Sequence, residues 1–519
     1  MANLLLTKSL ETILSEAAET GEHTFNRTLG PLSLIALGIG AIIGTGIFVL
    51  TGPAAARYAG PGVVYSFIVA AIGCVFAGLC YAEFAAMIPV AGSAYTYAYA
   101  TLGEIFAWII GWDLVLEYAF GAATVCSGWS GYVLSLGQDF GLRLPPELAG
   151  TPGSTFVFYQ GSWEFLGRVG SKLQGLGIDP ATLPQRHGVF NLIAFLGIML
   201  VTAILIVGVK ESANFNGVIV AVKLLVLVIF LVLGAATLMR HPEMPRQNWH
   251  PFLPPNTGAF GAFGWSGVLR GAGVTFFAYI GFDAVSTAAQ EAKDPKRDMP
   301  VGILGSLVIC TILYILVALV LTGLVNYKLL NVPDSLAVGI DVTGAKWGSL
   351  LVKLGALGGL TSTMLVMLLG QSRVFFSMSK DGLLPGFFSK VHPKFRTPWI
   401  SSLTVGLVVA VFACTIPLDK LGEMTSIGTL LAFIIVCAGV LLLRRNRPDL
   451  RRPFRVPLMP ATPILGILIS LAMMFGLPWE TWLRLVIWLA IGLGIYFMYG
   501  RFHSHPQAKA VLPEAPRLG

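Results

Sequence analysis

The stretch LGIGAIIGTGIF at residues 37–48 decides the fold, because four glycines interrupt an otherwise apolar run. A second apolar run, FFAYIGFDAVSTA at residues 276–288, carries Gly281 and Asp283 near its middle. Each glycine weakens a helix by about 1 kcal/mol relative to alanine. Two such interrupted runs at corresponding positions of two chain halves indicate broken membrane helices that enclose a binding site. The alternative is that the glycines only permit close helix crossings.

The composition indicates an integral membrane protein. The chain has 519 residues, of which 55% are hydrophobic and 12% are charged. A soluble domain carries roughly a quarter charged residues, so about half of the usual charge is missing. The net charge of +8 does not indicate nucleic-acid binding, because the arginines lie between apolar runs. The six cysteines fall inside or at the edges of apolar runs without the spacing of metal ligands, so we expect no metal site.

Apolar runs long enough to cross a bilayer, about 20 residues each, predict about twelve transmembrane helices. We expect an all-α polytopic fold in which spans one to five and six to ten form two inverted repeats, with two extra helices appended. The repeats would cover residues 31–240 and 265–442, and the extra helices residues 462–500. The spans lie near residues 32–52, 63–88, 104–136, 188–209, 213–239, 265–289, 301–325, 347–376, 398–415, 422–442, 462–477 and 481–500.

The placement of lysine and arginine predicts the orientation in the membrane. The loops after spans six, eight and ten hold thirteen of these residues, whereas the loops after spans seven, nine and eleven hold three. Both termini are therefore expected in the cytoplasm of a multi-pass protein of the inner or plasma membrane. Residues 1–30 would form a cytoplasmic segment with a short surface helix, and residues 501–519 a tail. The long loop at residues 137–187, rich in Gly, Pro and polar residues, would cover the outer surface.

An unwound helix segment exposes backbone N–H groups and carbonyls that suit the two charges of an amino acid. The N-terminus of a half-helix favours a carboxylate, and unwound carbonyls accept hydrogen bonds from an ammonium group. We expect the N–H groups of Thr45 and Gly46 to bind the carboxylate, and carbonyls of both breaks to bind the amine. The full set of predicted substrate-binding residues is Ile42, Ile43, Gly44, Thr45, Gly46, Phe277, Ala278 and Ile280.

Lys223 is the strongest single candidate for a functional residue, because it lies about ten residues into the apolar fifth span. An ionisable residue at that depth is a functional hypothesis by default. Burial favours the neutral amine, so a lysine that gains and loses a proton could couple transport to protons. The alternative is a structural lysine that stays charged and binds carbonyls of neighbouring helices. Thr361, Ser362 and Thr363 offer hydroxyls at a depth that could meet it.

Three other residues are candidates for the pocket and its selectivity. Glu117 in the third span lines the pocket or bonds to the outer helices. Asp283 either faces the pocket or caps the second half of the broken sixth span, since Asp is a preferred N-cap residue. Tyr279, with the phenylalanines beside it, could form a lid. Lys353, near the start of the eighth span, is expected to extend its amine to the surface.

Several long stretches resemble the amino acid–polyamine–organocation (APC) superfamily. TLGPLSLIALGIGAIIGTGIF (28–48) looks like its first helix, and residues 78–104, 276–303 and 372–385 are similar to its cationic amino acid transporter branch, including bacterial permeases. The resemblance runs from about residue 25 to 460. It implies a five-plus-five inverted-repeat fold and alternating access to a site at mid-membrane.

The resemblance also assigns roles to single residues of this sequence. The glycine motif of the family's first helix matches Gly44, Thr45 and Gly46, and the break in its sixth helix matches residues 277–281. The fifth-helix lysine of sodium-independent relatives matches Lys223. The resemblance therefore implies proton coupling, with the proton as coupling ion and no other cofactor.

The branch name does not decide the substrate, because a cationic side chain would need an acidic partner and only Glu117 and Asp283 are candidates. We expect small neutral L-amino acids such as alanine, with arginine or lysine as the second choice. An obligate exchanger and a sensor that binds without transport remain open. An enzyme is not expected, because no histidine lies within a span and there is no HExxH motif. Nucleic acid is not an expected partner, and the sequence does not indicate whether a small membrane subunit accompanies the chain.

Overall fold

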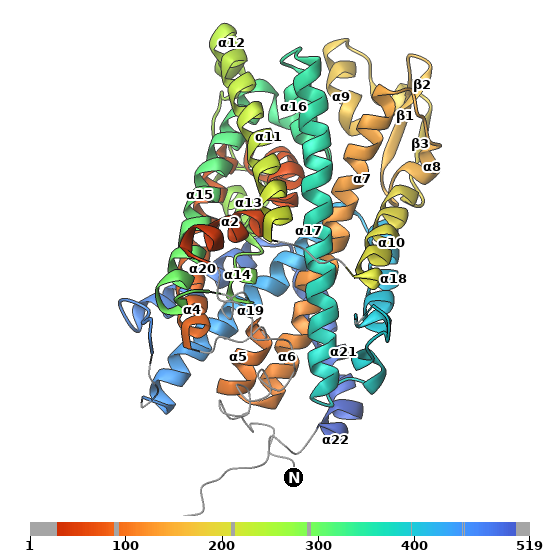
Figure 1. The fold of residues 1–519 in the computed structure, drawn as a ribbon. Coiled ribbons are helices and arrows are strands. Elements are labelled where there is room, and N and C mark those ends of the chain that lie inside the picture. The colour runs from red at the N-terminus through yellow and green to blue at the C-terminus, as the bar shows by residue number, and fades with distance from the viewer. Residues whose placement is uncertain are drawn as a thin grey trace, which may run out of the picture.

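The computed structural model describes residues 29–87, 93–208, 213–287, 292–395, 397–448, 450 and 452–504. These residues form a bundle of long, roughly parallel helices (Figure 1). A surface helix was expected within residues 1–30, and residues 1–28 of that segment lie outside the described part of the chain. Most of the expected tail, residues 505–519, also lies outside it.

Twelve helical spans follow one another through the described residues. The first half contains α2 (Pro31–Ile42) continued by η1 (Gly46–Leu50), α3 (Thr51–Ala54) and η2 (Ala55–Ala59), then α4 (Val63–Met87), α6 (Glu104–Val115) continued by η4 (Leu116–Phe120) and α7 (Gly121–Asp139), α10 (Leu192–Val207) and α11 (Ala213–Arg240). The second half contains α13 (Gly264–Thr275) with η6 (Phe276–Tyr279) and α14 (Ala284–Thr287), then α15 (Pro295–Leu324), α17 (Lys346–Lys380), α18 (Trp399–Thr415) and α19 (Leu418–Asn446). The two appended spans are α20 (Ala461–Gly476) and α21 (Trp479–Ile495) with η10 (Tyr496–Gly500) and α22 (Arg501–His503).

Length and composition suit these helices to a bilayer. Among the described residues, seven helical segments are long and apolar enough to cross a membrane, and four more apolar helices are shorter. The broken segment α13–η6–α14 is the remaining span of the twelve described above. Large apolar side chains such as Leu225 on α11 and Leu468 on α20 are more than half exposed, which only a lipid environment tolerates in such numbers.

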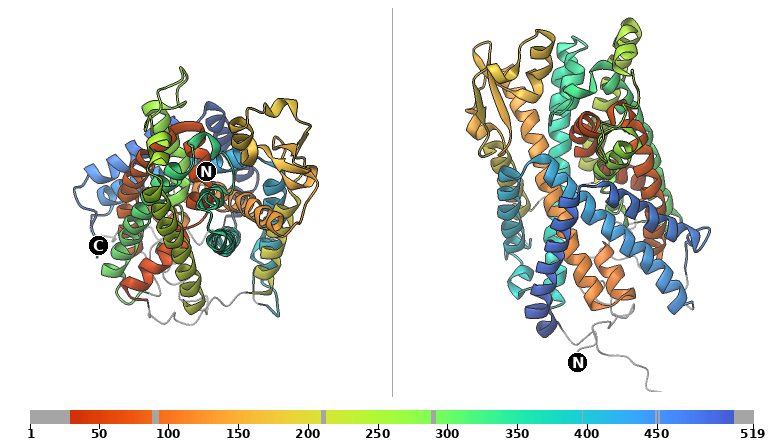
Figure 2. Two further views of the ribbon diagram at one scale, coloured as in Figure 1. Left: turned by 90° about the horizontal axis from the view of Figure 1, so that it is seen from above. Right: turned by 180° about the vertical axis from the view of Figure 1, so that it is seen from behind.

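The two broken spans lie inside the bundle. The helix α15 packs against both α2 and α4, and α17 packs against α7 and α11. The helices α10 and α18 pack against each other at one side, whereas α20 and α21 lie on the outside of α19 (Figure 2). Among the seven long apolar segments of the described chain, Trp479–His503 is the least buried, at 22% of its most apolar stretch. The breaks are therefore shielded from lipid by surrounding helices.

One end of the bundle carries a small folded unit that we call the cap, residues 146–187. It consists of α8 (Pro146–Ala149), β1 (Thr155–Tyr159), β2 (Ser162–Phe165), α9 (Leu166–Gly175), η5 (Pro180–Thr182) and β3 (Gln185–His187). The strands form an antiparallel sheet in the order β2-β1-β3, and Phe156 pairs with Phe165 and with Arg186. Gln160 and Gly161 make the β1–β2 turn with φ of 50° and 81°, which suits a tight hairpin. The sequence predicted a covering loop here, but not a sheet.

Candidate functional site

The first break interrupts the first span after Ile42. The α-helix ends there because Ile43 is extended, with φ −71° and ψ 102°. Helical structure resumes at Gly46, preceded by Thr45. The first N–H groups of a helix have no earlier carbonyl within the helix to bind. Thr45 and Gly46 therefore lie at the start of this helical segment, where backbone N–H groups lack partners within the helix.

The second break interrupts the sixth span after Tyr279. Ile280 is extended, with φ −58° and ψ 133°, and Gly281 has a φ of +116°. Only glycine adopts such a φ without strain. A side chain at Gly281 would also lie 2.7 Å from the carbonyl oxygen of Ala41, on the first broken span. Gly281 is therefore required both by the turn and by the close approach of the two spans.

The two breaks are in direct backbone contact. A Cβ atom on Gly46 would lie 2.0 Å from the Cα atom of Ala278. A Cβ atom on Gly44 would lie 2.8 Å from the hydroxyl of Thr363 on α17. The glycines of the first span thus allow close packing, and the same contact brings together the backbone groups predicted to bind an amino acid. All eight predicted substrate-binding residues belong to these two segments.

The C-terminal carbonyls of α2 are the polar groups that organise this centre. The last four carbonyls of a helix lack partners within the helix. The Ile39 carbonyl accepts from the N–H of Ile43, and the Gly40 carbonyl accepts from Lys223 Nζ at 2.8 Å. Lysine at a helix C-terminus also opposes the negative end of the helix dipole. Lys223 therefore caps the half-helix before the first break.

Lys223 is 1% exposed and reaches this position from α11. Its Nζ also lies 3.3 Å from the Thr363 hydroxyl. No carboxylate among the described residues lies within ion-pair distance of Lys223. The ammonium group is thus held by a carbonyl and a hydroxyl, which are neutral partners.

The hydroxyl partner of Lys223 differs from two of the predicted ones. Thr361 and Ser362 donate to the Leu357 and Gly359 carbonyls of their own helix. Thr363 lies on the face of α17 that meets α11, and its hydroxyl is the one near Lys223. Three consecutive hydroxyls point in three directions around a helix, so only one can face a given neighbour.

Tyr314 on α15 joins the two breaks, and the sequence analysis did not identify it. Its hydroxyl lies 3.0 Å from the Ile42 carbonyl and 2.9 Å from the Ala278 carbonyl. Both carbonyls are among those predicted to bind the substrate amine. A buried tyrosine in an apolar span usually needs a hydrogen-bond partner, which was the available signal.

The acidic candidates lie in a separate buried cluster. Glu117 belongs to the π-helical turn η4 and is 1% exposed. Neither its carboxylate oxygens nor those of Asp113 have a hydrogen-bond partner among the described residues. The Asp283 carboxylate accepts a hydrogen bond from Tyr118 at 3.2 Å. Asp283 itself belongs to the second break, whereas Asp113 and Glu117 belong to α6 and η4 of the third span.

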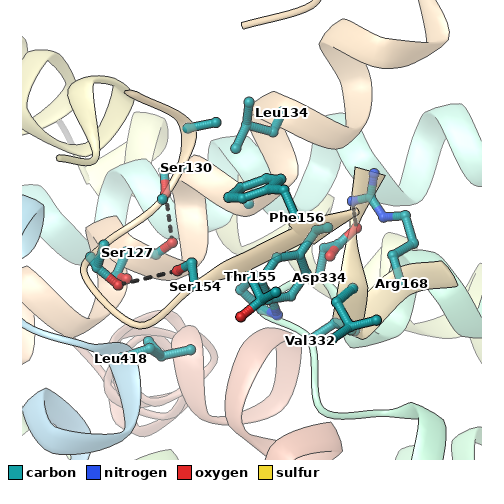
Figure 3. A pocket seen from close by; sticks show the side chains of 18 of the residues that line it. Ser127, Ser130, Leu134, Ser154, Thr155, Phe156, Arg168, Val332, Asp334 and Leu418 are labelled. Atoms are coloured by element: carbon teal, nitrogen blue, oxygen red, sulfur yellow. Dashed lines mark hydrogen bonds and ion pairs between the residues drawn. The ribbon is translucent and has the colours of Figure 1, made fainter. Parts of the chain in front are cut away.

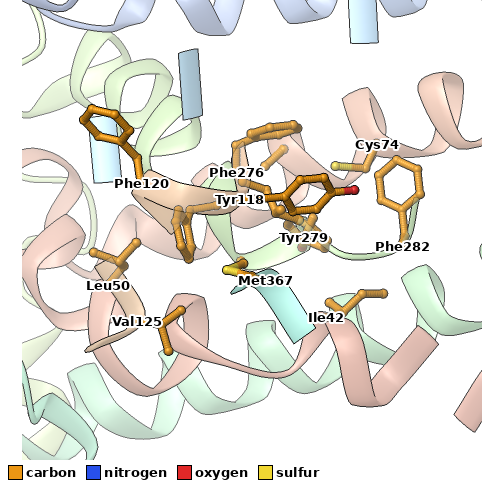
Figure 4. Packing of buried hydrophobic residues seen from close by; sticks show 14 of the residues in the cluster. Ile42, Leu50, Cys74, Tyr118, Phe120, Val125, Phe276, Tyr279, Phe282 and Met367 are labelled. Atoms are coloured by element: carbon orange, nitrogen blue, oxygen red, sulfur yellow. The ribbon is translucent and has the colours of Figure 1, made fainter. Parts of the chain in front are cut away.

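Aromatic and aliphatic side chains fill the space around the breaks (Figure 4). The Tyr279 hydroxyl donates to the Phe67 carbonyl on α4 at 3.0 Å, which directs this residue towards α4. Phe276 packs edge-on against Phe433 with ring centroids 5.2 Å apart. Met367 on α17 contacts the third span, since a Cβ atom on Gly121 would lie 3.0 Å from its sulfur. The surroundings of the second break are therefore largely apolar.

A cavity of about 700 Å³ opens between the cap and the bundle (Figure 3). Its lining includes Leu50 at the end of η1 and Val274 just before η6. It therefore begins beside the two breaks and extends towards the cap. None of the eight predicted substrate-binding residues lines it, because the two breaks pack on each other.

The opposite end of the bundle is closed by a charged contact. Glu83 at the end of α4 pairs with Arg444 at the end of α19 and lies 3.5 Å from Arg452. Its carboxylate also accepts the N–H of Val456 at 2.7 Å. Glu83 is 2% exposed, so these contacts leave little room beside it. The centre is thus approached from the cap side.

Comparisons with known proteins agree on one family. Residues 29–500 match the family model described as amino acid permease. The chain is 42% identical over 504 residues to a methylthioribose transporter of Bacillus subtilis (strain 168), covering 97% of this chain and 99% of the relative. It is 43% identical over 498 residues to the branched-chain amino acid permease BcaP of the same organism, covering 96% of this chain and 97% of that one.

The fold also matches a solved structure. The crystal structure of MhsT in complex with L-phenylalanine superposes with a TM-score of 0.52, covering 91% of this chain and 100% of that chain, at 15% sequence identity. At that identity the likeness concerns the fold alone. It confirms the expected architecture of two five-helix repeats with two further helices.

Proposed function

The chain belongs to the amino acid permease family, and on that premise we propose that it is a proton-coupled symporter of neutral L-amino acids. It lies in the inner or plasma membrane as a multi-pass protein with the cap outside and both termini in the cytoplasm. The observation that carries the proposal is the placement of Lys223 at the end of α2, beside the two breaks. Protons are the coupling ion, and no other cofactor takes part.

Backbone groups at the two breaks bind the common part of the amino acid. The N–H groups of Thr45 and Gly46 point at the carboxylate, where the helix dipole favours negative charge. The amine takes the carbonyls of Ile42 and Ala278, which both lie within hydrogen-bond distance of the Tyr314 hydroxyl. An ammonium group has three N–H donors and can satisfy both carbonyls at once, whereas the Tyr314 hydroxyl donates to only one of them at a time.

Proton coupling acts through the hydrogen bond that Lys223 donates to the C-terminal end of α2. The ammonium group donates to Gly40 and opposes the negative helix end, a contribution of about 0.3–1 kcal/mol that reaches about 2 kcal/mol when buried. The neutral amine keeps the hydrogen bond but loses the charge interaction. Protonation therefore favours α2 in its present position, and deprotonation favours its release. Protonation of Lys223 is thereby linked to the position of α2, and loss of the proton favours opening of the cytoplasmic side of the bundle.

The surroundings of the second break support a neutral side chain. Phe276 and Met367 are buried apolar side chains, and Met367 packs closely against Gly121, which favours a short neutral side chain over a long one. Alanine is therefore the first substrate to test. BcaP bears the name of a branched-chain amino acid permease, which also suits an apolar site, whereas methylthioribose is not an amino acid.

A cationic amino acid is the second candidate, because of the acidic cluster. The carboxylates of Glu117 and Asp113 are buried without hydrogen-bond partners among the described residues, and a buried carboxylate is costly unless it is paired or protonated. A lysine or arginine substrate could pair with Glu117. Competition between alanine and arginine separates the two candidates.

The test is uptake of labelled L-alanine into proteoliposomes that contain no amino acid, with the outside more acidic than the inside. Accumulation that a protonophore abolishes is the expected result, and excess L-leucine but not L-arginine should compete. Uptake that requires internal amino acid would show an exchanger. Binding without accumulation would show a sensor, and competition by arginine alone would favour the cationic candidate.

A further inference from the structure

The end of α19 and the connection from it to α20 carry arginines of two kinds. Arg444 and Arg452 reach inwards, since both lie against the buried carboxylate of Glu83. Arg445 and Arg455 are exposed, and neither forms an ion pair among the described residues. The inward arginines are therefore neutralised in part by Glu83, whereas the two exposed ones keep positive charges that no described carboxylate offsets.

A backbone contact brings the two exposed arginines to the same corner of the bundle. Arg444 Nη2 donates to the Val456 carbonyl at 3.3 Å. The chain after α19 thus folds back against the last turn of that helix, which places Arg455 close to the helix end that carries Arg445. Figure 2 shows this connection at the side of the bundle, where it projects beyond the helices.

Exposed leucines flank the two arginines. Leu442, near the end of α19, is 42% exposed, and Leu458, just before α20, is 81% exposed. The apolar surface continues along α20, where Leu468 is 55% exposed. Exposed leucines of this kind are stable against acyl chains, whereas arginines at the end of a span extend to the polar headgroups. This corner therefore lies at the boundary between acyl chains and headgroups.

The two kinds of side chain match the two parts of an anionic phospholipid. A guanidinium group binds a phosphate through paired N–H···O bonds, which are stronger than bonds between neutral groups. Each arginine beside the cytoplasmic end of a span raises the affinity for anionic headgroups about fivefold. A soluble anion would use the arginines but not the exposed leucines. The combination therefore favours a lipid as the occupant.

We propose that Leu442, Arg445, Arg455 and Leu458 form a binding site for an anionic phospholipid of the cytoplasmic leaflet. The phosphate binds the two guanidinium groups, and the leucines contact the acyl chains. The same connection holds Glu83, so a bound lipid stabilises the charged contact that closes this end of the bundle. The choice of leaflet rests on the proposed orientation of the chain, whereas the binding itself does not.

The test measures lipid binding to the full-length protein in a neutral detergent. Phosphatidylglycerol should raise the Tm and phosphatidylcholine should change it little, because a ligand of the folded state stabilises that state. Arg445→Gln combined with Arg455→Gln should weaken phosphatidylglycerol binding about thirtyfold, from about fivefold for each arginine. Lys390→Gln combined with Lys394→Gln is the matched control, because these exposed lysines lie in the loop after span eight and should leave the affinity unchanged.

Further variants cover the case in which the double glutamine variant fails to fold. Arg455→Gln alone should weaken binding about fivefold, and Arg455→Lys should weaken it less because the charge remains. An equal rise in Tm with phosphatidylcholine, or an unchanged affinity in the glutamine variants, would overturn the site. Displacement of phosphatidylglycerol by inorganic phosphate would show a soluble anion as the occupant and overturn the lipid. None of these results depends on alanine uptake, so a failure of the proposed transport activity is distinguishable.

Discussion

Among the described residues, two lysines are buried in the membrane-spanning helices, and they differ in the groups that surround their amines. Lys223 on α11 is 1% exposed and contacts a carbonyl and a hydroxyl. Lys353 on α17 is 3% exposed, and its Nζ lies 2.8 Å from Asp139 and 3.7 Å from Asp341. Burial is therefore nearly equal, whereas a compensating negative charge is present only at Lys353 among the described residues.

The difference separates a proton carrier from a structural charge. A buried amine beside a carboxylate gains from staying charged, while one beside neutral groups has less reason to retain its proton. Lys353 lies where α17 meets α7 at the cap end, and Lys223 lies at the breaks. The sequence predicted that Lys353 would extend to the surface, but it is buried and reaches half-exposed carboxylates instead. Depth in a span alone therefore does not assign a function to a lysine.

The largest expected effect comes from removing the amine of Lys223. Lys223→Ala should reduce proton-driven uptake of L-alanine to the level of empty liposomes, because the coupling charge and the hydrogen bond to the Gly40 carbonyl of α2 are both lost. Exchange of labelled alanine against internal alanine should persist, since the backbone site remains. A mutant that still accumulates alanine under a proton gradient would remove the distinction between the two lysines.

A smaller effect is expected at Tyr314, which occupies carbonyls of the same centre. Tyr314→Phe should tighten alanine binding about fivefold, corresponding to about 1 kcal/mol for one hydrogen bond. The reason is that the Ile42 and Ala278 carbonyls lose a donor that competes with the substrate amine. Equilibrium binding to the purified variant measures this. Weaker binding would show that Tyr314 shapes the site rather than competing for it.

Removing the Thr363 hydroxyl tests how much Lys223 depends on its neutral hydrogen-bond partner, which is the feature that distinguishes it from Lys353. Thr363→Val should lower proton-driven uptake about two- to tenfold, because one hydrogen bond contributes about 0.5–1.5 kcal/mol. Thr363→Ser should restore it. The matched control is Thr361→Val, whose hydroxyl bonds to its own helix and should matter little. Equal losses at both positions would point to a general effect on α17.

The smallest effect on transport is expected at Lys353. Lys353→Met should keep alanine uptake within about twofold of wild type and lower the unfolding free energy by about 1 kcal/mol, because the remaining carboxylates are half exposed and stay solvated. Thermal unfolding in detergent measures the loss of stability. Loss of coupling with unchanged stability would give Lys353 the role proposed for Lys223.

Local patterns were enough to predict much of this fold. The apolar runs gave the spans, and glycine placement located both breaks. Lys223 stood out because it is the one charge within an apolar run of the fifth span. These features depend on residues close together in the chain, which is why they can be read without the structure.

Features that depend on distant segments could not be predicted in the same way. Thr363 was distinguishable from Thr361 and Ser362 only after α11 and α17 were packed together. The ion pair of Arg57 with Asp419, both in the cavity lining, joins residues that lie 362 positions apart in the chain. Tyr314 meets Ile42 across 272 residues. The predicted role of Tyr279 in a lid stays a prediction, although its hydroxyl is directed towards α4.

Proton movement itself tests the central claim most directly. Proteoliposomes containing a pH-sensitive dye and internal alanine, but no imposed pH gradient, would receive external alanine in excess. The account predicts that alanine entry acidifies the interior in the wild type and in Lys353→Met, whereas Lys223→Ala exchanges alanine without acidification. Acidification by Lys223→Ala at the wild-type rate would contradict the assignment of the coupling proton to Lys223.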